Sequence, residues 1–204
     1  ASVVGRRKCR RPERRRCGCM LPGTEQRLRQ TGGRELARVV FDEATLDRRV
    51  RELGQQITAR YPEGDLLVLG LLKGSFIFLS DLVRRIERPL QVDFLVAASY
   101  GSGTESSGTV RLLYDPETEL RGRHLLLVED IIDTGRTLNR LLTLLRAREP
   151  RSLEICALLH KHVADGLTQE AAFVGFDAPP AFLVGYGLDH AENFRHLPYI
   201  ASLD

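Results

Sequence analysis

Residues 125–138 constrain the fold of this chain more than any other stretch. The run begins with apolar residues, passes through the adjacent carboxylates Glu129 and Asp130, and continues into a short turn and a helical pattern. This succession predicts a buried strand, a loop and a helix, with polar chemistry at the carboxyl end of the strand. Open α/β sheets bind their ligands at that edge, so the run indicates both a fold class and the place of a site.

The turn after the carboxylates is suited to an anion. Backbone N–H groups of Thr134, Gly135 and Arg136 can converge on a phosphate, and the hydroxyls of Thr134 and Thr137 can add donors. The two carboxylates upstream would repel a phosphate and suit sugar hydroxyls or a bridging cation. The run therefore predicts a site for a phosphorylated sugar. The plainer alternative is a buried parallel strand followed by an acidic helix cap.

The rest of the chain alternates between apolar runs and helical patterns. Strands are predicted at residues 66–72, 92–98, 154–159, 172–176 and 182–186. One helix is predicted to begin after Asp42 and to end at Tyr61, a second to span residues 75–86, and a third to follow the phosphate turn. This alternation predicts an α/β fold with a mostly parallel β-sheet flanked by helices.

The positive charge of the chain lies at its N-terminal end. Residues 1–19 hold eight of the 30 Lys and Arg residues and one of the 27 acidic residues, so the remainder is mildly acidic. The net charge of +3 therefore says little about the partners of the folded part. The basic segment is open to three interpretations: an upstream segment before a start at Met20, a transit peptide, or a nucleic-acid-binding tail.

Length and composition agree with a single folded domain. The chain has 204 residues, of which 43% are hydrophobic, which is enough for one sizeable core. No apolar run approaches the ~20 residues that span a bilayer, so we expect no membrane partner. The absence of a secretory apolar segment favours a cytoplasmic location. We expect residues 1–35 to form a basic, disordered extension and residues 36–204 to form the domain.

Lysine is rare in this chain, which has 27 Arg and three Lys residues. Lys73 and Lys161 each directly follow a predicted buried strand. Retention of Lys in so arginine-rich a chain indicates a need for a compact ammonium group in place of a planar guanidinium. The alternative is that both are solvated charges at strand ends.

Residues 129–137 resemble the phosphoribosyl-pyrophosphate signature of the type I phosphoribosyltransferases. The pattern of two acids, two Ile and Asp-Thr-Gly is similar to that of the hypoxanthine-guanine phosphoribosyltransferases. The resemblance implies a fold with a small hood subdomain and a Mg²⁺-dependent enzyme of purine salvage. The implied reaction moves a 5-phosphoribosyl group from phosphoribosyl pyrophosphate to hypoxanthine or guanine, giving IMP or GMP and pyrophosphate.

The resemblance also implies roles for the residues of this signature. Asp133 would handle the proton on N7 of the purine. The phosphoribosyl group and its 5′-phosphate would contact Glu129, Asp130, Asp133, Thr134, Gly135, Arg136 and Thr137. Glu129 and Asp130 would hold a metal, and Asp189 would help to hold a second one.

Four further segments carry the resemblance. Residues 71–75 resemble the pyrophosphate loop, in which a cis bond precedes the Lys, so Lys73 and Gly74 would contact pyrophosphate. Arg195, in residues 193–196, corresponds to the arginine that meets pyrophosphate in the family. Ser99 and Tyr100 open a Gly- and Ser-rich stretch similar to the mobile lid.

The other two segments concern the purine. Residues 159–162 resemble the purine-selecting segment, in which Lys161 would donate to the 6-oxo group. Residues 182–189 resemble the hood over the base, where Phe182 would stack on the purine and Leu183 would present backbone groups.

The resemblance leaves several points open. Arg136 stands where many relatives have Lys, and His190 stands where Tyr is common, so affinity is less certain than the reaction. Family members are dimers or tetramers, and a homodimer or homotetramer is expected. The sequence does not rank hypoxanthine, guanine and xanthine. The alternative function is a regulator of the same fold that binds RNA or DNA through its basic leader.

Overall fold

The computed structural model describes residues 30–34, 36–99, 110–161 and 166–203. Contacts within the chain divide it into two units, residues 1–35 and 36–204. In the described part of the first unit, the Thr31 hydroxyl donates to the Arg34 carbonyl at 2.6 Å. The disorder expected of residues 1–35 stays a prediction. The second unit contains every helix and strand discussed below.

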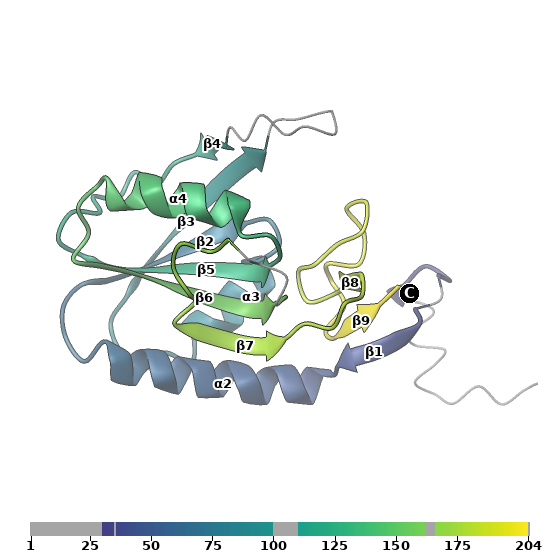
Figure 1. Ribbon diagram of the computed structural model, residues 1–204. Helices are drawn as coiled ribbons and strands as arrows, with labels where there is room; N and C mark the ends of the chain where they lie inside the picture. Colours follow the sequence, from purple (N-terminus) through teal and green to yellow (C-terminus); the bar gives the residue numbers. More distant parts are fainter. Residues whose placement is uncertain (1–29, 35, 100–109, 162–165, 204) are drawn as a thin grey trace, which may run out of the picture. The chain divides into compact units, whose positions relative to one another are not determined.

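A six-stranded sheet forms the centre of the second unit in the described chain (Figure 1). Its spatial order is β4-β3-β2-β5-β6-β7. The strands are β2 (Leu66–Leu72), β3 (Gln91–Ser99), β4 (Val110–Tyr114), β5 (His124–Ile132), β6 (Ser152–His160) and β7 (Phe173–Asp177). Only β4 runs antiparallel to its neighbour, so the predicted mostly parallel sheet is confirmed.

Helices cover both faces of this sheet, as Figure 1 shows. Helices α2 (Glu43–Arg60) and α3 (Phe76–Val83) pack on one face, and α4 (Arg136–Arg146) packs on the other. The predicted cap is present, since the Thr45 N–H donates to the Asp42 carboxylate at 2.8 Å. None of the described helices is long and apolar enough to cross a bilayer.

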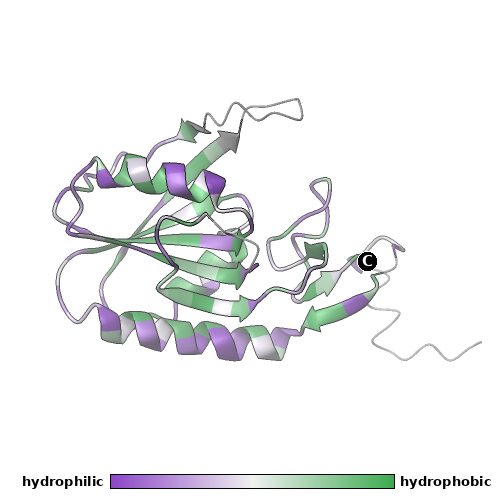
Figure 2. Ribbon diagram, in the orientation of Figure 1, coloured by the Kyte–Doolittle hydropathy of each residue, from purple (hydrophilic) through white to green (hydrophobic). Residues whose placement is uncertain are grey.

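The middle of β5 is fully buried because both of its faces meet a helical layer. Leu125 and Leu127 belong to the core under α4, whereas Leu126 and Val128 belong to the core under α2 and α3. All four side chains have no exposed surface. A continuous apolar run is what a covered parallel strand requires, and Figure 2 shows the apolar character of these central strands.

A second, three-stranded sheet forms the predicted hood. It consists of β1 (Arg38–Phe41), β9 (Ile200–Ser202) and β8 (Leu183–Val184), all antiparallel. Its own core contains Val184, Phe194, Leu197, Tyr199 and Ala201. In Figure 1 this sheet lies beyond the carboxyl ends of β5, β6 and β7.

The elements differ from the sequence prediction in three respects. The strand predicted at residues 182–186 shrinks to β8 and joins the hood, because Gly185 and Gly187 have φ of 97° and 103° and turn the chain. Helix α3 ends at Val83, where the Arg85 N–H donates to the Leu82 carbonyl in a tighter turn. The short strands β1, β4 and β9 were not predicted.

The contact between α2 and α3 yields a stability prediction. A β-carbon at Gly54 would lie 2.5 Å from both the β-carbon and the carbonyl oxygen of Arg85. Helix propensity alone favours Gly54→Ala by about 1 kcal/mol, whereas overpacking costs about 1–3 kcal/mol. We expect denaturant unfolding to show a net destabilisation of up to about 2 kcal/mol, with no such loss for the exposed control Gln56→Ala. A more stable Gly54→Ala would contradict this packing.

Candidate active site

The predicted phosphate turn connects β5 to α4. Gly135 is the N-cap residue of α4 and has φ of 71°, a conformation that glycine adopts without strain. The Asn139 N–H donates to the Gly135 carbonyl at 2.9 Å, which is the first bond of the helix. A cavity of about 120 Å³ lies here, lined by Glu129, Ile131, Ile132, Asp133, Thr134, Gly135, Arg136, Thr137 and Leu138. Free N–H groups at the start of α4 make this cavity suitable for an anion.

Glu129 and Asp130 lie within β5, two residues before its end at Ile132. The strand thus continues past the carboxylates, and it carries them into a buried environment. Burial raises the pKa of the Glu129 carboxyl well above its usual range, and the charge of Asp130 adds to this effect. Its Oε2 atom is buried and has no hydrogen-bond partner among the described residues.

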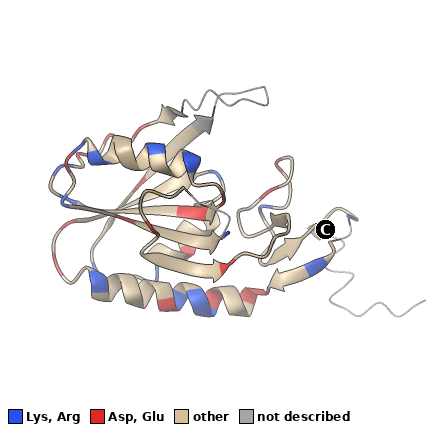
Figure 3. Ribbon diagram, in the orientation of Figure 1, with Lys and Arg blue, Asp and Glu red and all other residues tan. Residues whose placement is uncertain are grey.

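Burial also raises the pKa of Asp130, from 3.8 to about 6. The backbone N–H of Ile131, which donates to Asp130 at 2.9 Å, and the charge of Arg195 act in the opposite direction. The negative charge of Asp189, which lies in the hood segment, raises the pKa further. Figure 3 shows acidic residues at this edge of the sheet.

These carboxylates fit a divalent cation that is shared with a ligand. No group of three or more His, Cys, Asp and Glu side chains gathers at one point in the described part of the chain. However, the unpartnered Glu129 oxygen and the adjacent Asp130 carboxylate are hard oxygen donors. Mg²⁺ is usually held by one or two carboxylates together with ligand phosphates and water, so the donor set is compatible with it.

The predicted pyrophosphate loop lies between β2 and α3, directly beside these carboxylates. The Leu72–Lys73 peptide bond is cis, as the resemblance implied. A β-carbon at Gly74 would lie 1.6 Å from the Asp130 carboxylate, and one at Gly187 would lie 2.0 Å from the Gly74 carbonyl oxygen. Glycine at both positions therefore lets three segments, from β5, the loop and the hood, pack against one another.

Two cations from different segments meet at this loop through acidic side chains. The Arg195 guanidinium contacts Asp189 at 2.8 Å and donates to the Gly187 carbonyl at 2.9 Å. Lys73 Nζ lies 3.0 Å from one oxygen of Glu192, and Arg195 Nη2 lies 3.2 Å from the other. Sequence reasoning missed Glu192, because an Ala-Glu pair carries no turn or ligand motif.

Among the predicted purine-binding residues, Lys161 lies beside the turn, whereas Phe182 and Leu183 lie in the hood segment. Lys161 directly follows β6, and its Nζ lies 3.9 Å from Asp133 Oδ1. Its backbone N–H donates to the Ile132 carbonyl at 2.9 Å, which ties the ends of β5 and β6 together. Phe182 is half exposed before β8, whereas Leu183 within β8 is buried.

Some predicted features lie outside the described residues. Ser99 ends β3, where it pairs with Val110 of β4, but Tyr100 and the rest of the expected lid lie in residues 100–109. The basic leader lies outside them as well. The lid and the leader therefore stay predictions.

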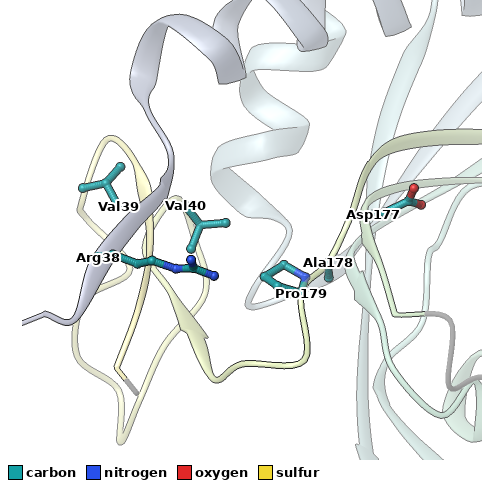
Figure 4. A pocket seen from close by; sticks show the side chains of 6 residues that line it. All are labelled: Arg38, Val39, Val40, Asp177, Ala178 and Pro179. Carbon is teal, nitrogen blue, oxygen red and sulfur yellow. The ribbon is translucent and has the colours of Figure 1, made fainter.

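A separate hollow of about 420 Å³ lies between β1 and the end of β7 (Figure 4). It is lined by Arg38, Val39, Val40, Asp177, Ala178 and Pro179. None of these residues belongs to the predicted site. The predicted residues instead gather at the carboxyl edge of β2, β5 and β6.

The buried Asp130 carboxyl yields a pH-dependent prediction. Its pKa of about 6 exceeds the unfolded value, so the folded state holds the proton more tightly and loses stability as the pH rises from about 4 to about 6. Asp130→Asn should therefore raise the unfolding free energy at pH 7.5, with chelator present, by about 2–3 kcal/mol. The gain should shrink toward pH 4.

The exposed Asp133→Asn is the matched control, and it should change the unfolding free energy little at either pH. Equal stability of wild type and Asp130→Asn at pH 7.5 would contradict the burial argument.

Comparisons with known proteins agree with this geometry. The phosphoribosyl transferase domain profile matches residues 41–191. Hypoxanthine phosphoribosyltransferase of Salmonella typhimurium is 45% identical over 167 residues, which cover 81% of this chain and 94% of that protein.

Solved structures give the same result. The fold is similar to that of a hypoxanthine phosphoribosyltransferase from Staphylococcus aureus, with a TM-score of 0.80, 41% identity, and coverage of 83% of this chain and 92% of that one. It is also similar to a hypoxanthine-guanine phosphoribosyltransferase from Bacillus anthracis, with a TM-score of 0.79, 40% identity, and coverage of 83% and 100%. The chain therefore belongs to the hypoxanthine phosphoribosyltransferases, within the phosphoribosyl transferase domain family.

Proposed function

We propose that this chain transfers a 5-phosphoribosyl group from phosphoribosyl pyrophosphate to hypoxanthine or guanine at the carboxyl edge of its sheet. The observation that carries the proposal is the 3.9 Å approach of Lys161 to Asp133 beside the phosphate turn. This separation supports an ammonium donor and a carboxylate base that act on one planar base from the ends of neighbouring strands. The alternative, a regulator that binds nucleic acid, depends on a leader outside the described residues.

The donor is recognised by two anion sites that flank the carboxylates. The 5′-phosphate occupies the turn at the start of α4, where Thr134, Gly135 and Thr137 offer donors. The pyrophosphate lies against Lys73, Gly74 and Arg195. The ribose lies between them, with its hydroxyls directed at the β5 carboxylates, and this spacing holds the donor by both ends.

Glu129 and Asp130 would hold one Mg²⁺ together with oxygens of the donor, and Asp189 would help to hold a second. When bound, the cation would neutralise the negative charge that develops on the leaving pyrophosphate. The chain itself contributes Lys73 and Arg195, which stabilise the leaving pyrophosphate as positive character develops at the sugar carbon. The expected lid would exclude water at this stage.

The base is oriented by Lys161 and activated by Asp133. The ammonium of Lys161 donates to the 6-oxo group of the purine, and Phe182 covers the ring from the hood. Asp133 takes up the proton that N7 loses as the base becomes nucleophilic. The resemblance also supports a homodimer or homotetramer as the working form.

Base choice tests the role of Lys161. An ammonium has three donors and no acceptor, so it satisfies a 6-oxo group but meets another donor at the 6-amino group of adenine. Turnover assays should show discrimination against adenine by about 10⁴-fold or more, and Lys161→Gln should weaken that preference at some cost in rate. Equal use of adenine and hypoxanthine by the wild type would contradict both the residue assignment and the 6-oxopurine reaction.

The proton-handling role of Asp133 is tested by Asp133→Asn, which keeps the shape but removes the carboxylate. We expect kcat to fall by about 10²- to 10⁴-fold while the donor still binds, because the change removes a proton acceptor and leaves the phosphate turn intact. Donor binding is measured by calorimetry beside the rate. An unchanged kcat would remove Asp133 from the mechanism.

A further inference from the structure

Glu192 holds together the two cations that the proposed function assigns to pyrophosphate. One carboxylate oxygen lies 3.0 Å from Lys73 Nζ, and the other lies 3.2 Å from Arg195 Nη2. Pyrophosphate offers the same chemistry, namely negative oxygens that bridge two cations. The Glu192 carboxylate and pyrophosphate cannot both contact Lys73 and Arg195 at once, because two anions at contact distance repel each other.

The backbone around Glu192 presents its carboxylate at this place. His190 and Asn193 exchange backbone hydrogen bonds at 3.2 and 3.1 Å, so Ala191 and Glu192 form a two-residue turn. Both have positive φ, 51° and 63°, a conformation that favours Gly or Asn. The turn thus keeps a glutamate at a position whose backbone conformation favours Gly or Asn. The backbone N–H of Glu192 donates to the Asp189 carboxylate at 2.8 Å.

The contact is easily reversed. The side chains of Glu192 and Lys73 are about two-thirds exposed, at 65% and 66%. Lys73 and then Arg195 lower the pKa of the Glu192 carboxyl, so it is ionised at neutral pH. Arg195, at 19% exposed, keeps its second partner Asp189 when Glu192 leaves. Exposed ion pairs are worth little individually, so Glu192 can tune affinity without blocking the site.

We propose that Glu192 is an internal competitor of pyrophosphate, which occupies the Lys73–Arg195 subsite when that subsite is empty and is displaced when the donor binds. The inference rests on the proposed function. This competition lowers the affinity of the protein for phosphoribosyl pyrophosphate, the donor, and for pyrophosphate, the product. As the product leaves, the Glu192 carboxylate again forms ion pairs with Lys73 and Arg195 and neutralises their positive charge.

The test is calorimetric titration of inorganic pyrophosphate, with Mg²⁺ present, into wild type and Glu192→Gln. We expect the variant to bind pyrophosphate about two- to tenfold more tightly at low ionic strength, with a smaller gain at high salt. The KM for the donor should fall in parallel, whereas kcat should not rise. A merely structural role would weaken binding, so the direction of the change discriminates.

Two further variants complete the design. Glu63→Gln makes the same charge change on an exposed residue before β2, at the opposite end of that strand, and should leave pyrophosphate affinity unchanged. Glu192→Gly removes the carboxylate and relieves the positive φ, so it should also tighten binding. Melting temperatures establish that each variant is folded.

Equal or weaker pyrophosphate binding by both Glu192 variants would overturn the inference. If the wild type turns over hypoxanthine in the same preparation, only the inference fails. If the wild type neither turns over hypoxanthine nor binds pyrophosphate, the proposed function fails with it.

Discussion

The partial burial of two adjacent carboxylates near the end of β5 is the constraint on which the rest of the site depends. β5 has a parallel neighbour on each side and a helical layer on each face, so Glu129 and Asp130 enter an environment with little water. Charge in such an environment is costly unless it is paired, and burial raises the pKa of both carboxyls. Positive charge at this edge therefore stabilises the carboxylates, and Arg195, Lys73 and a divalent cation can each supply it.

Close packing of backbone against carboxylate sets the geometry around that charge. Gly74 leaves room for Asp130, and Gly187 leaves room for the Gly74 carbonyl, so loop, hood and β5 pack together without intervening side chains. The proposed ligand sites then follow from position: phosphate at the start of α4, base beside Lys161 and pyrophosphate at the loop. In the proposed account, the Glu192 carboxylate supplies the negative charge for Lys73 and Arg195 that pyrophosphate replaces on binding.

The parts of this arrangement that depend on local sequence could be predicted. The run from β5 into α4 has an apolar strand, a glycine that takes positive φ and a leucine stripe. Each of these features depends on residues close together in the sequence, so the sequence predicts them. Lys73 and Lys161 were located because each follows a buried strand. The pairing of β1 with β9 joins residues at opposite ends of the domain, and Glu192 reaches Lys73 across 119 positions, so neither leaves a local pattern. The expected roles of the site residues and of the lid still await experiment.

The central claim is that burial at the end of β5 raises the pKa of the Glu129 and Asp130 carboxyls, so that this edge favours an incoming cation. The most direct measurement is calorimetry of the preformed Mg²⁺ complex of phosphoribosyl pyrophosphate binding at pH 6, in buffers of different ionisation enthalpy. Binding should release on the order of one proton per site in the wild type, because a protonated carboxyl group must lose its proton to bind a cation. The release should be smaller in Asp130→Asn. Binding of the same complex without proton release would show that both carboxyls are already ionised in the free protein, which contradicts the account.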